Sequence, residues 1–159
     1  MQSRKISTPK KGFSLIELLV VLGMLAVIGG FSLAISMENY RGSAFDDEQA
    51  LLIAALQKAR SEGLSGVCIG GSCTAGQSHG VHIDPAQLVI FQGTNYSESD
   101  ANNEYLPLQN NALMFSGMSD VVFAEFSGDA SPAGAIVLSD TDRVSTTTIG
   151  EEGQIMLDN

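Results

Sequence analysis

The strongest constraint in this sequence is the apolar run at residues 13–35, FSLIELLVVLGMLAVIGGFSLAI. Fourteen of its 23 residues are Leu, Ile, Val or Phe, and Glu17 is the only charged one. As an α-helix the run would be roughly 34 Å long, enough for a bilayer core of about 30 Å. Its apolar side chains favour insertion by about 4–8 kcal/mol, against about 2.5–3.5 kcal/mol for one central carboxylate. We therefore predict a transmembrane helix over residues 13–35.

The charges are placed unevenly on the two sides of this run. Four of the eight Lys and Arg residues lie within the first eleven residues, which contain no acid. Basic residues hold the preceding end of a membrane helix on the cytoplasmic side, so we expect everything after residue 36 to lie outside. From residue 13 onward, 4 basic residues stand against 18 acidic ones, a balance of 4 − 18 = −14. Such a body repels phosphate groups, and no nucleic acid partner is expected.

Glu17 distinguishes the run from ordinary targeting segments. A secretory signal peptide has an apolar core of about 7–15 residues and a small-residue cleavage site, and neither is found here. A plain signal anchor fits the length but leaves the acid unexplained. An acid in a membrane helix normally has a partner, and this helix holds no positive charge. Either Glu17 is protonated or its partner belongs to another molecule.

The string KKGFSLIELLVVLGMLAVI closely resembles the class III leader and N-terminal helix of type IV prepilins and type II secretion pseudopilins. The shared pattern is basic residues, Gly, Phe, three residues, Glu and then an unbroken apolar run. The resemblance implies that residues 1–12 are a leader peptide. A prepilin peptidase would cut between Gly12 and Phe13 on the cytoplasmic side and methylate the new amino group of Phe13.

The resemblance also supplies a partner for Glu17. In a fibre of such subunits, Glu17 would pair with the Phe13 ammonium of a neighbouring subunit. An unpaired carboxylate in an apolar core is costly, whereas a paired one is tolerated. The implied partners are other pilin-like subunits, the inner membrane and, indirectly, an assembly platform and its ATPase.

The helix is predicted to continue outside the membrane over residues 36–62. Apolar residues recur there at spacings of three, four or seven and form one stripe: Ala44, Phe45, Leu51, Leu52, Ala55, Leu56 and Ala59. Arg41, Asp47, Glu48, Lys58 and Glu62 are expected to fall largely outside the stripe. Gly63 and Gly66 are expected to end the helix near residue 62.

Residues 63–159 change in character and predict a β-rich globular domain. Short β-favouring runs alternate with Gly, Asn, Asp and Ser, at 67–69, 80–83, 87–92, 112–116, 121–126, 134–139, 144–149 and 153–157. Val122, Ala124 and Phe126 are expected on one face, and residues 95–111 form a polar loop. We expect antiparallel strands packed on the outer part of the helix, an α+β pilin fold.

The C-terminal half resembles the GspH/FimT subgroup of minor pseudopilins and pilins. Residues 121–157 show two apolar strands around a Gly-containing turn and a last strand that begins Gly153-Gln154-Ile155. Residues 55–63, ALQKARSEG, are similar to the end of that subgroup's long helix. Members of the FimT type that take up DNA carry basic residues around the last strand, whereas this strand has none.

Cys68 and Cys73 are the two cysteines. Outside the cytoplasm a Cys68–Cys73 disulfide is favoured, and the glycines between them suit a tight loop. A zinc site with His79 and His82 is a less favoured alternative, because the Cys–His spacer is short and the compartment is oxidising. Free thiols are the other alternative. We therefore expect a disulfide and no metal site.

The remaining candidate residues favour no enzyme. His79 and His82 lack a nucleophile motif beside them and are expected to be surface or packing residues. Two pairs of acids are possible calcium ligands but lack the EF-hand pattern, so solvated turns are favoured: Glu98 with Asp100, and Asp140 with Asp142. The glycine-rich residues 70–76 lack the Lys of a phosphate-binding loop. No catalytic residue and no cofactor is predicted.

The expected function is that of a structural subunit: a minor pseudopilin that supports protein secretion through a type II secretion pseudopilus. The alternative is a minor pilin of a type IV pilus, involved in pilus assembly, adhesion or DNA uptake. Either would lie in the inner membrane with one span, its N-terminus in the cytoplasm and its globular domain in the periplasm.

Overall fold

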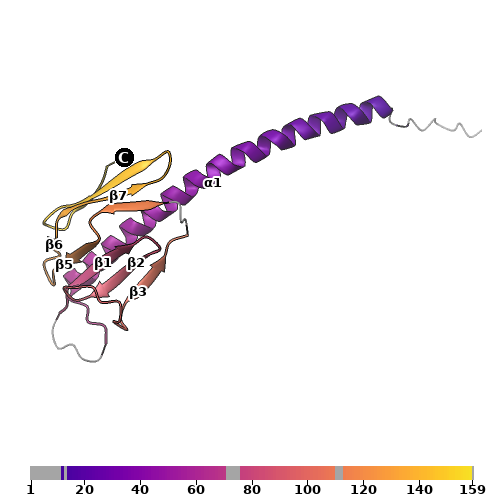
Figure 1. Cartoon of the computed structure of the whole chain (residues 1–159). Helices are drawn as coiled ribbons and strands as arrows, with labels where there is room; N and C mark the ends of the chain where they lie inside the picture. The colour runs from indigo at the N-terminus through magenta and orange to yellow at the C-terminus, as the bar shows by residue number, and fades with distance from the viewer. Residues whose placement is uncertain (1–11, 13, 71–75, 110–112, 159) are drawn as a thin grey trace, which may run out of the picture. The chain divides into compact units, whose positions relative to one another are not determined.

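The structure is a computed structural model, and it describes residues 12, 14–70, 76–109 and 113–158, without the side chains of residues 31–42. Its contacts divide the chain into two units, residues 1–41 and residues 42–159. The first unit holds the start of a helix. The second holds the rest of that helix and all the described strands, and it is the unit in which the sheets form (Figure 1).

Helix α1 (Leu15–Ser65) passes through Gly23, Gly29 and Gly30 and ends three residues beyond the predicted end. Gly63 does not end it. Gly66 does, with φ at +58°, a left-handed conformation that costs glycine little. The N–H of Gly66 donates to the carbonyl of Gly63, and the N–H of Val67 donates to that of Glu62. This pair of bonds is the Schellman motif, which satisfies carbonyls left free at a helix end.

In the described part of the chain, nine strands form two antiparallel sheets beside the second part of α1 (Figure 1). Sheet A has the order β3-β2-β1-β5-β6, with β1 (His79–Asp84), β2 (Gln87–Gln92), β3 (Glu104–Pro107), β5 (Asp120–Phe123) and β6 (Ala130–Ser131). Sheet B has the order β4-β7-β8-β9, with β4 (Met114–Gly117), β7 (Gly134–Ser139), β8 (Val144–Ile149) and β9 (Ile155–Asp158). The predicted α+β fold, a helix packed on antiparallel sheets, is confirmed.

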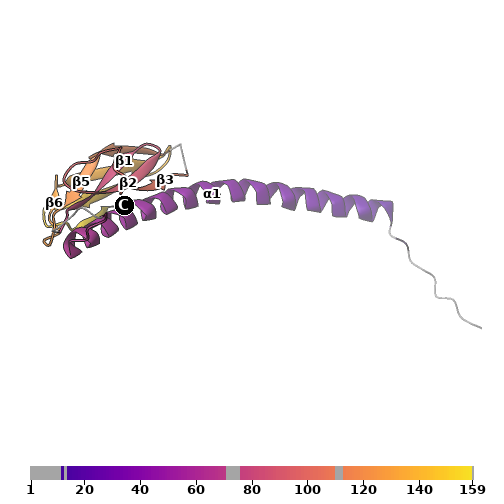
Figure 2. The same cartoon turned by 90° about the horizontal axis from the view of Figure 1, so that it is seen from below.

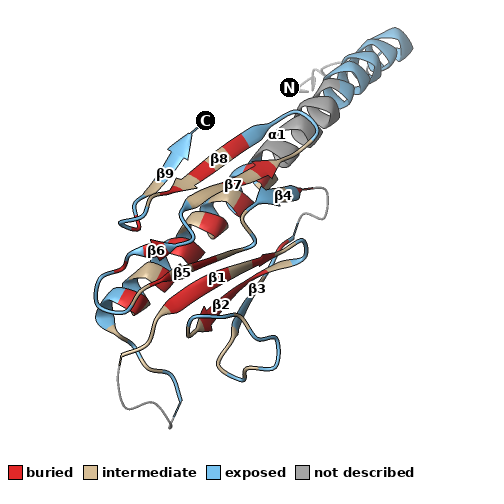
Figure 3. Cartoon of the chain, turned by 60° about the vertical axis from the view of Figure 1, so that its left-hand side comes forward, coloured by how far each residue is buried: buried red, intermediate tan, exposed pale blue. Residues whose placement is uncertain are grey.

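The core of the second unit is shared by α1 and both sheets. The predicted stripe supplies its helical side: Phe45, Leu52, Ala55, Leu56 and Ala59 are all buried. Sheet A adds side chains such as Val81 and Leu88, and sheet B adds Ile136 and Ile149. The strands lie along one side of this part of the helix (Figure 2), and buried residues occur on this part of α1 and in both sheets (Figure 3).

The expectation that Glu48 lies outside the stripe is wrong. Its side chain is buried at 5% exposure, in line with Phe45 and Leu52 along the helix. The carboxylate is not isolated there, because its Oε1 accepts a hydrogen bond of 2.6 Å from the backbone N–H of Gln109. Buried polar groups are accepted in a core when they are hydrogen-bonded in this way.

The predicted strands at 87–92, 134–139 and 144–149 are β2, β7 and β8, with the predicted bounds. Residues 67–69 form no strand, because the chain there is leaving the helix end. The predicted loop at 95–111 contains strand β3. Its side chains are largely exposed at a sheet edge, so they lack the apolar alternation of an inner strand.

The predicted strand at 121–126 ends early and faces the other way. Strand β5 stops at Phe123, and its buried side chains are Val121 and Phe123 instead of Val122. Phe126 has φ at +61° and its side chain is 67% exposed. The tight turn after β5 therefore breaks the alternation on which the prediction depended.

The outer face of sheet A is covered as well as the inner one. Val89 and Phe91 alternate with core residues along β2, yet both are buried. Tyr96, from the loop after β2, stacks on His82 with the ring centroids 4.0 Å apart, and its ring lies 5.7 Å from that of Phe91. The loop is thus part of the packed domain.

Candidate functional site at the N-terminal segment

Glu17 lies in the first turn of α1. The carbonyl of Ser14 accepts hydrogen bonds from the N–H groups of Glu17 at 3.1 Å and of Leu18 at 3.2 Å, so Ser14 is the N-cap of the helix. Ser14 and Glu17 have the Ser-x-x-Glu spacing of a capping box. This spacing is visible in the sequence, but the prepilin resemblance does not use it. A carboxylate there also interacts favourably with the helix dipole. Glu17 therefore lies at a position where a carboxylate favours the start of the helix.

The side chains around Glu17 are apolar and uncovered. Every residue of the first unit whose burial is described, 12 and 14–30, is exposed, including Leu15 at 77% and Leu18 at 57%. Exposed apolar side chains continue on all sides of the helix as far as Ile28. Soluble single domains do not leave such a surface to water, and large exposed apolar patches mark lipid or protein contacts. The surface of this segment is therefore that of a helix covered by lipid or by other protein chains.

Gly12, the predicted residue before the cleavage site, is exposed, and a side-chain carbon added to it would meet no atom within 4 Å. Nothing in the described chain therefore requires a glycine there. Phe13 and the leader residues 1–11 lie outside the described residues. The cleavage and methylation of Phe13 remain predictions.

Among the described residues, no helix combines the length and apolar character needed to cross a bilayer. Phe13 and the side chains of residues 31–35, which belong to the predicted span, lie outside the described part. The span over 13–35 therefore remains a prediction.

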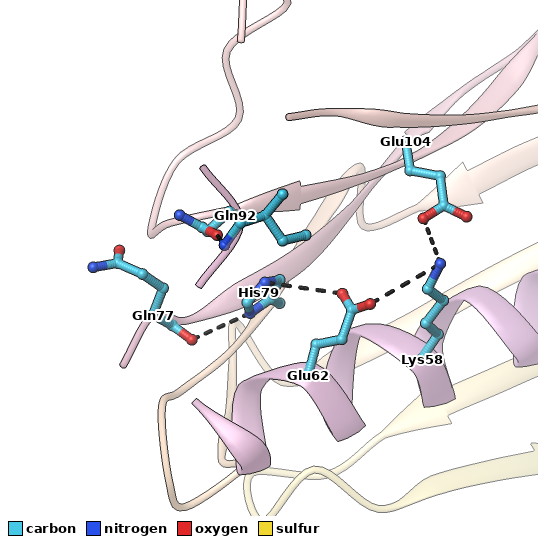
Figure 4. Close-up of polar contacts among 7 residues, drawn as sticks. Lys58, Glu62, Gln77, His79, Gln92 and Glu104 are labelled. Carbon is cyan, nitrogen blue, oxygen red and sulfur yellow. Dashed lines mark hydrogen bonds and ion pairs between the residues drawn. The ribbon is translucent and has the colours of Figure 1, made fainter. Parts of the chain in front are cut away.

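A second polar cluster joins the end of α1 to sheet A (Figure 4). His79 is buried at 1% exposure, and its Nε2 lies 3.9 Å from Oε2 of Glu62 without a hydrogen bond. Its Nδ1 lies 3.2 Å from the carbonyl oxygen of Gln77. Lys58 contacts Glu62 at 4.0 Å and pairs with Glu104 on β3. The cluster links helix and sheet, and no nucleophile belongs to it.

A third cluster lies on the outer face of sheet A. His82 Nδ1 is 2.7 Å from Oδ1 of Asp120, and Ser119 Oγ donates to Oδ2 of the same carboxylate at 2.7 Å. Burial raises the pKa of the neighbouring Tyr96, and Tyr105 and the nearby acids raise it further. Asp120 lies between the serine and the histidine, so Ser119 does not contact the imidazole that would activate it.

The two histidines therefore serve packing and polar contacts within the domain. Because they are three residues apart on strand β1, they point to opposite faces of sheet A. This geometry prevents both from binding one zinc ion. No group of three or more His, Cys, Asp or Glu in the described part of the chain could hold a metal ion.

Both predicted acidic pairs lie in turns, where an Asp carboxylate accepts a hydrogen bond from a backbone N–H group nearby in the chain. Asp100 Oδ1 accepts from the backbone N–H of Asn102 at 2.9 Å, and Asp140 Oδ1 accepts from that of Thr141 at 2.6 Å. Such short-range bonds are typical of turn-forming Asp residues. Neighbouring Arg143 pairs with Asp46 at 3.3 Å across to the helix.

Cys68 is disulfide-bonded and lies just after the end of α1. Cys73, and with it most of the glycine-rich segment 70–76, lies outside the described residues. The Cys68–Cys73 pairing therefore remains a prediction.

Of the alternatives for the N-terminal segment, comparison with known families supports the prepilin-type segment over a signal peptide or a plain signal anchor. Residues 8–33 match the family model described as the prokaryotic N-terminal methylation motif. The chain is prepilin-like. This prepilin-like chain thus carries the motif of the type IV prepilin and pseudopilin family, whose members are structural subunits. The motif implies processing by a prepilin peptidase, anchoring in the membrane through the N-terminal segment, and assembly into a fibre.

The match covers the segment that contains Gly12, Phe13 and Glu17 and leaves the β-rich domain of the prepilin-like chain unassigned. No curated protein and no solved structure gave a significant match to the chain.

Proposed function

We propose that this prepilin-like protein is a minor pseudopilin of the GspH/FimT type, which supports protein secretion as a subunit of a type II secretion pseudopilus. Its helix over residues 13–35 holds it in the inner membrane until assembly. The N-terminus lies in the cytoplasm, and the β-rich domain lies in the periplasm. A prepilin peptidase removes residues 1–12 and methylates Phe13.

The observation that carries this proposal is the surface of the first unit. From Leu15 to Ile28 its large apolar side chains are exposed on all sides of the helix, and one acid, Glu17, lies near the start. A bilayer can cover the apolar side chains, and so can a bundle of like helices in a fibre. Transfer from one to the other costs little hydrophobic energy, because lipid tails and helix side chains are similarly apolar.

Glu17 then makes the assembled state specific. In the fibre its carboxylate pairs with the Phe13 ammonium of a neighbouring subunit. An ion pair removed from water is stabilised only when its geometry is good, whereas one of its members left alone is strongly unfavourable. A subunit added out of register would leave Glu17 and a Phe13 ammonium unpaired, so the pair sets the axial position of each new subunit.

The second candidate is a minor pilin of a type IV pilus, because the methylation motif is common to both systems. A role in DNA uptake has less support. The described residues of β9 include no Lys or Arg, and the turn before it carries Glu151 and Glu152. Phosphate contacts need basic side chains.

The test combines location with loss of function. The chain is extracted from membranes and from sheared fibres, and mass spectrometry determines whether residues 1–12 are absent and Phe13 is methylated. Secretion and surface piliation are compared in a deletion strain and after complementation. Loss of secretion alone supports the pseudopilus, and loss of piliation alone supports the type IV pilus. An intact leader on the functional form, or absence from fibres, would overturn both.

A further inference from the structure

Strand β9 is an open edge of sheet B. It pairs with β8 on one side, and no strand of the described chain pairs with its other side. An edge of this kind presents backbone N–H and C=O groups that another strand can use. It is drawn mostly as exposed in Figure 3.

The outward-pointing backbone groups of β9 can be assigned. The N–H of Gly150 donates to the carbonyl of Gln154 at 2.9 Å, so residue 154 directs its backbone groups toward β8. In an antiparallel pair the direction alternates from residue to residue. Met156 and Asp158 therefore also bond to β8, and the N–H and C=O groups of Ile155 and Leu157 point to the open side.

The other three edges carry features that hinder strand addition. Edge strand β3 contains Pro107, which has no N–H, and the charged Glu104. Edge strand β6 is two residues long and is followed by Pro132. Edge strand β4 ends in Gly117 at φ +98°, which is not an extended conformation. Strand β9 contains no Pro, Gly, Lys or Arg, and its one charged residue, Asp158, is the last of the strand.

Two apolar side chains of β9, those of Met156 and Leu157, are not covered by the core of the domain. Leu157 lies opposite Thr147 on the inward face of sheet B, where Thr147 is buried at 2% exposure. Leu157 itself is 42% exposed, and Met156 on the opposite face is 51% exposed. Both faces of the edge are therefore apolar and incompletely covered.

We propose that the open edge of β9 receives an extended segment of a neighbouring pilin-like subunit, which adds a strand to sheet B. This inference rests on the proposed function, because assembly into a fibre supplies the neighbouring subunit. The added strand bonds to the backbone of Ile155 and Leu157 and covers the Leu157 side chain. Main-chain bonding supplies the contact, and the exposed side chains of Met156 and Leu157 favour an apolar segment.

The first test replaces Leu157 in the full-length chain. Leu157→Pro removes the outward N–H and leaves the bonds to β8 in place, and Leu157→Ala is the matched control that removes only the side chain. We expect recovery of Leu157→Pro in sheared fibres to fall about tenfold, the loss of one good hydrogen bond, with a smaller loss for Leu157→Ala. Thermal unfolding of both variants checks that the domain is folded.

The second test needs no substitution and decides the matter if Leu157→Pro does not fold. Hydrogen exchange of individual amides is measured for the wild-type chain in detergent and in isolated fibres. We expect slowed exchange in fibres at Ile155 and Leu157 and little change at Met156, which already bonds to β8. Equal exchange of all three amides in the two states would overturn the proposal, as would wild-type recovery of a folded Leu157→Pro variant.

The two proposals fail differently. If the wild-type chain is absent from fibres, the proposed function is wrong. If the wild-type chain is present and the β9 amides remain unprotected, only the strand addition is wrong.

Discussion

The side chain of Glu48, on α1, accepts a hydrogen bond at 2.6 Å from the backbone N–H of Gln109, 61 residues later. The bond ties the chain that follows β3 to the helix, beside the buried Leu108. Glu48→Ala should lower the free energy of unfolding by about 1–3 kcal/mol, because it leaves a donor without its acceptor. Denaturant unfolding measures the loss. Glu48→Gln keeps an acceptor oxygen and should lose less; equal losses would contradict this role.

Gly12 should be required by the peptidase and not by the fold. Gly12→Val should leave an uncleaved precursor, because the peptidase requires glycine before the cleavage site. The chain itself should tolerate the change, since a side-chain carbon added at Gly12 meets nothing within 4 Å. A larger band on a gel and residues 1–12 in the mass spectrum would show the precursor. Gly23→Ala, another change with open space around it, is the control and should be cleaved normally. Normal cleavage of Gly12→Val would remove the proposed site.

Glu17→Leu should be cleaved normally and should fail to enter the fibre, because the neighbouring ammonium then has no partner. Recovery in sheared fibres measures it. Glu17→Gln separates this role from a capping role, since Gln also serves at the third position of a capping box. If pairing matters, Glu17→Gln fails like Glu17→Leu. If Glu17→Gln assembles as well as wild type, Glu17 acts only at the helix start.

The predicted Cys68–Cys73 bond should be present but modest in effect. Thiol titration of the purified oxidised protein should detect no free thiol, and two free thiols would exclude the bond. The double change Cys68→Ser and Cys73→Ser should lower the free energy of unfolding by about 2 kcal/mol, because the closed loop is short. A single Cys68→Ser change provides the control, with one reactive thiol at Cys73.

Tyr96 should make the domain sensitive to alkaline pH. Its pKa is raised above 10.0 by burial and by nearby acids, so the folded state holds the phenol proton more tightly than the unfolded state. The resulting stability is complete below the unfolded pKa and is lost as pH rises through the folded pKa. Wild type should therefore lose more stability than Tyr96→Phe, which keeps the aromatic ring, between about pH 9 and about pH 11. Parallel losses in urea unfolding would contradict the assignment.

Periodic patterns predicted the elements whose burial is regular. The stripe from Phe45 to Ala59 and the strands β7 and β8 follow from alternation within the chain alone. The exceptions depend on distant partners. Glu48 lies in the buried stripe, where the backbone N–H of Gln109 bonds to it, and β3 pairs with β2 although its own residues are mostly exposed.

The assembly segment was predicted from a motif, and its exposed surface agrees with that reading. The open edge of β9 could not be predicted in the same way. Its importance lies in the order of strands in sheet B, and strand order is a property of the folded domain. Residues 155–158 alone read only as a short apolar strand.

The loop that carries Tyr96 restricts where this domain can be approached. Tyr96 packs against His82 and Phe91, so at these described residues little of sheet A is open to a partner. Changes in that loop would loosen the domain from within before they altered any outside contact. The proposed contact with a neighbouring subunit therefore lies on sheet B, whereas the loop that carries Tyr96 packs on sheet A and holds the domain together.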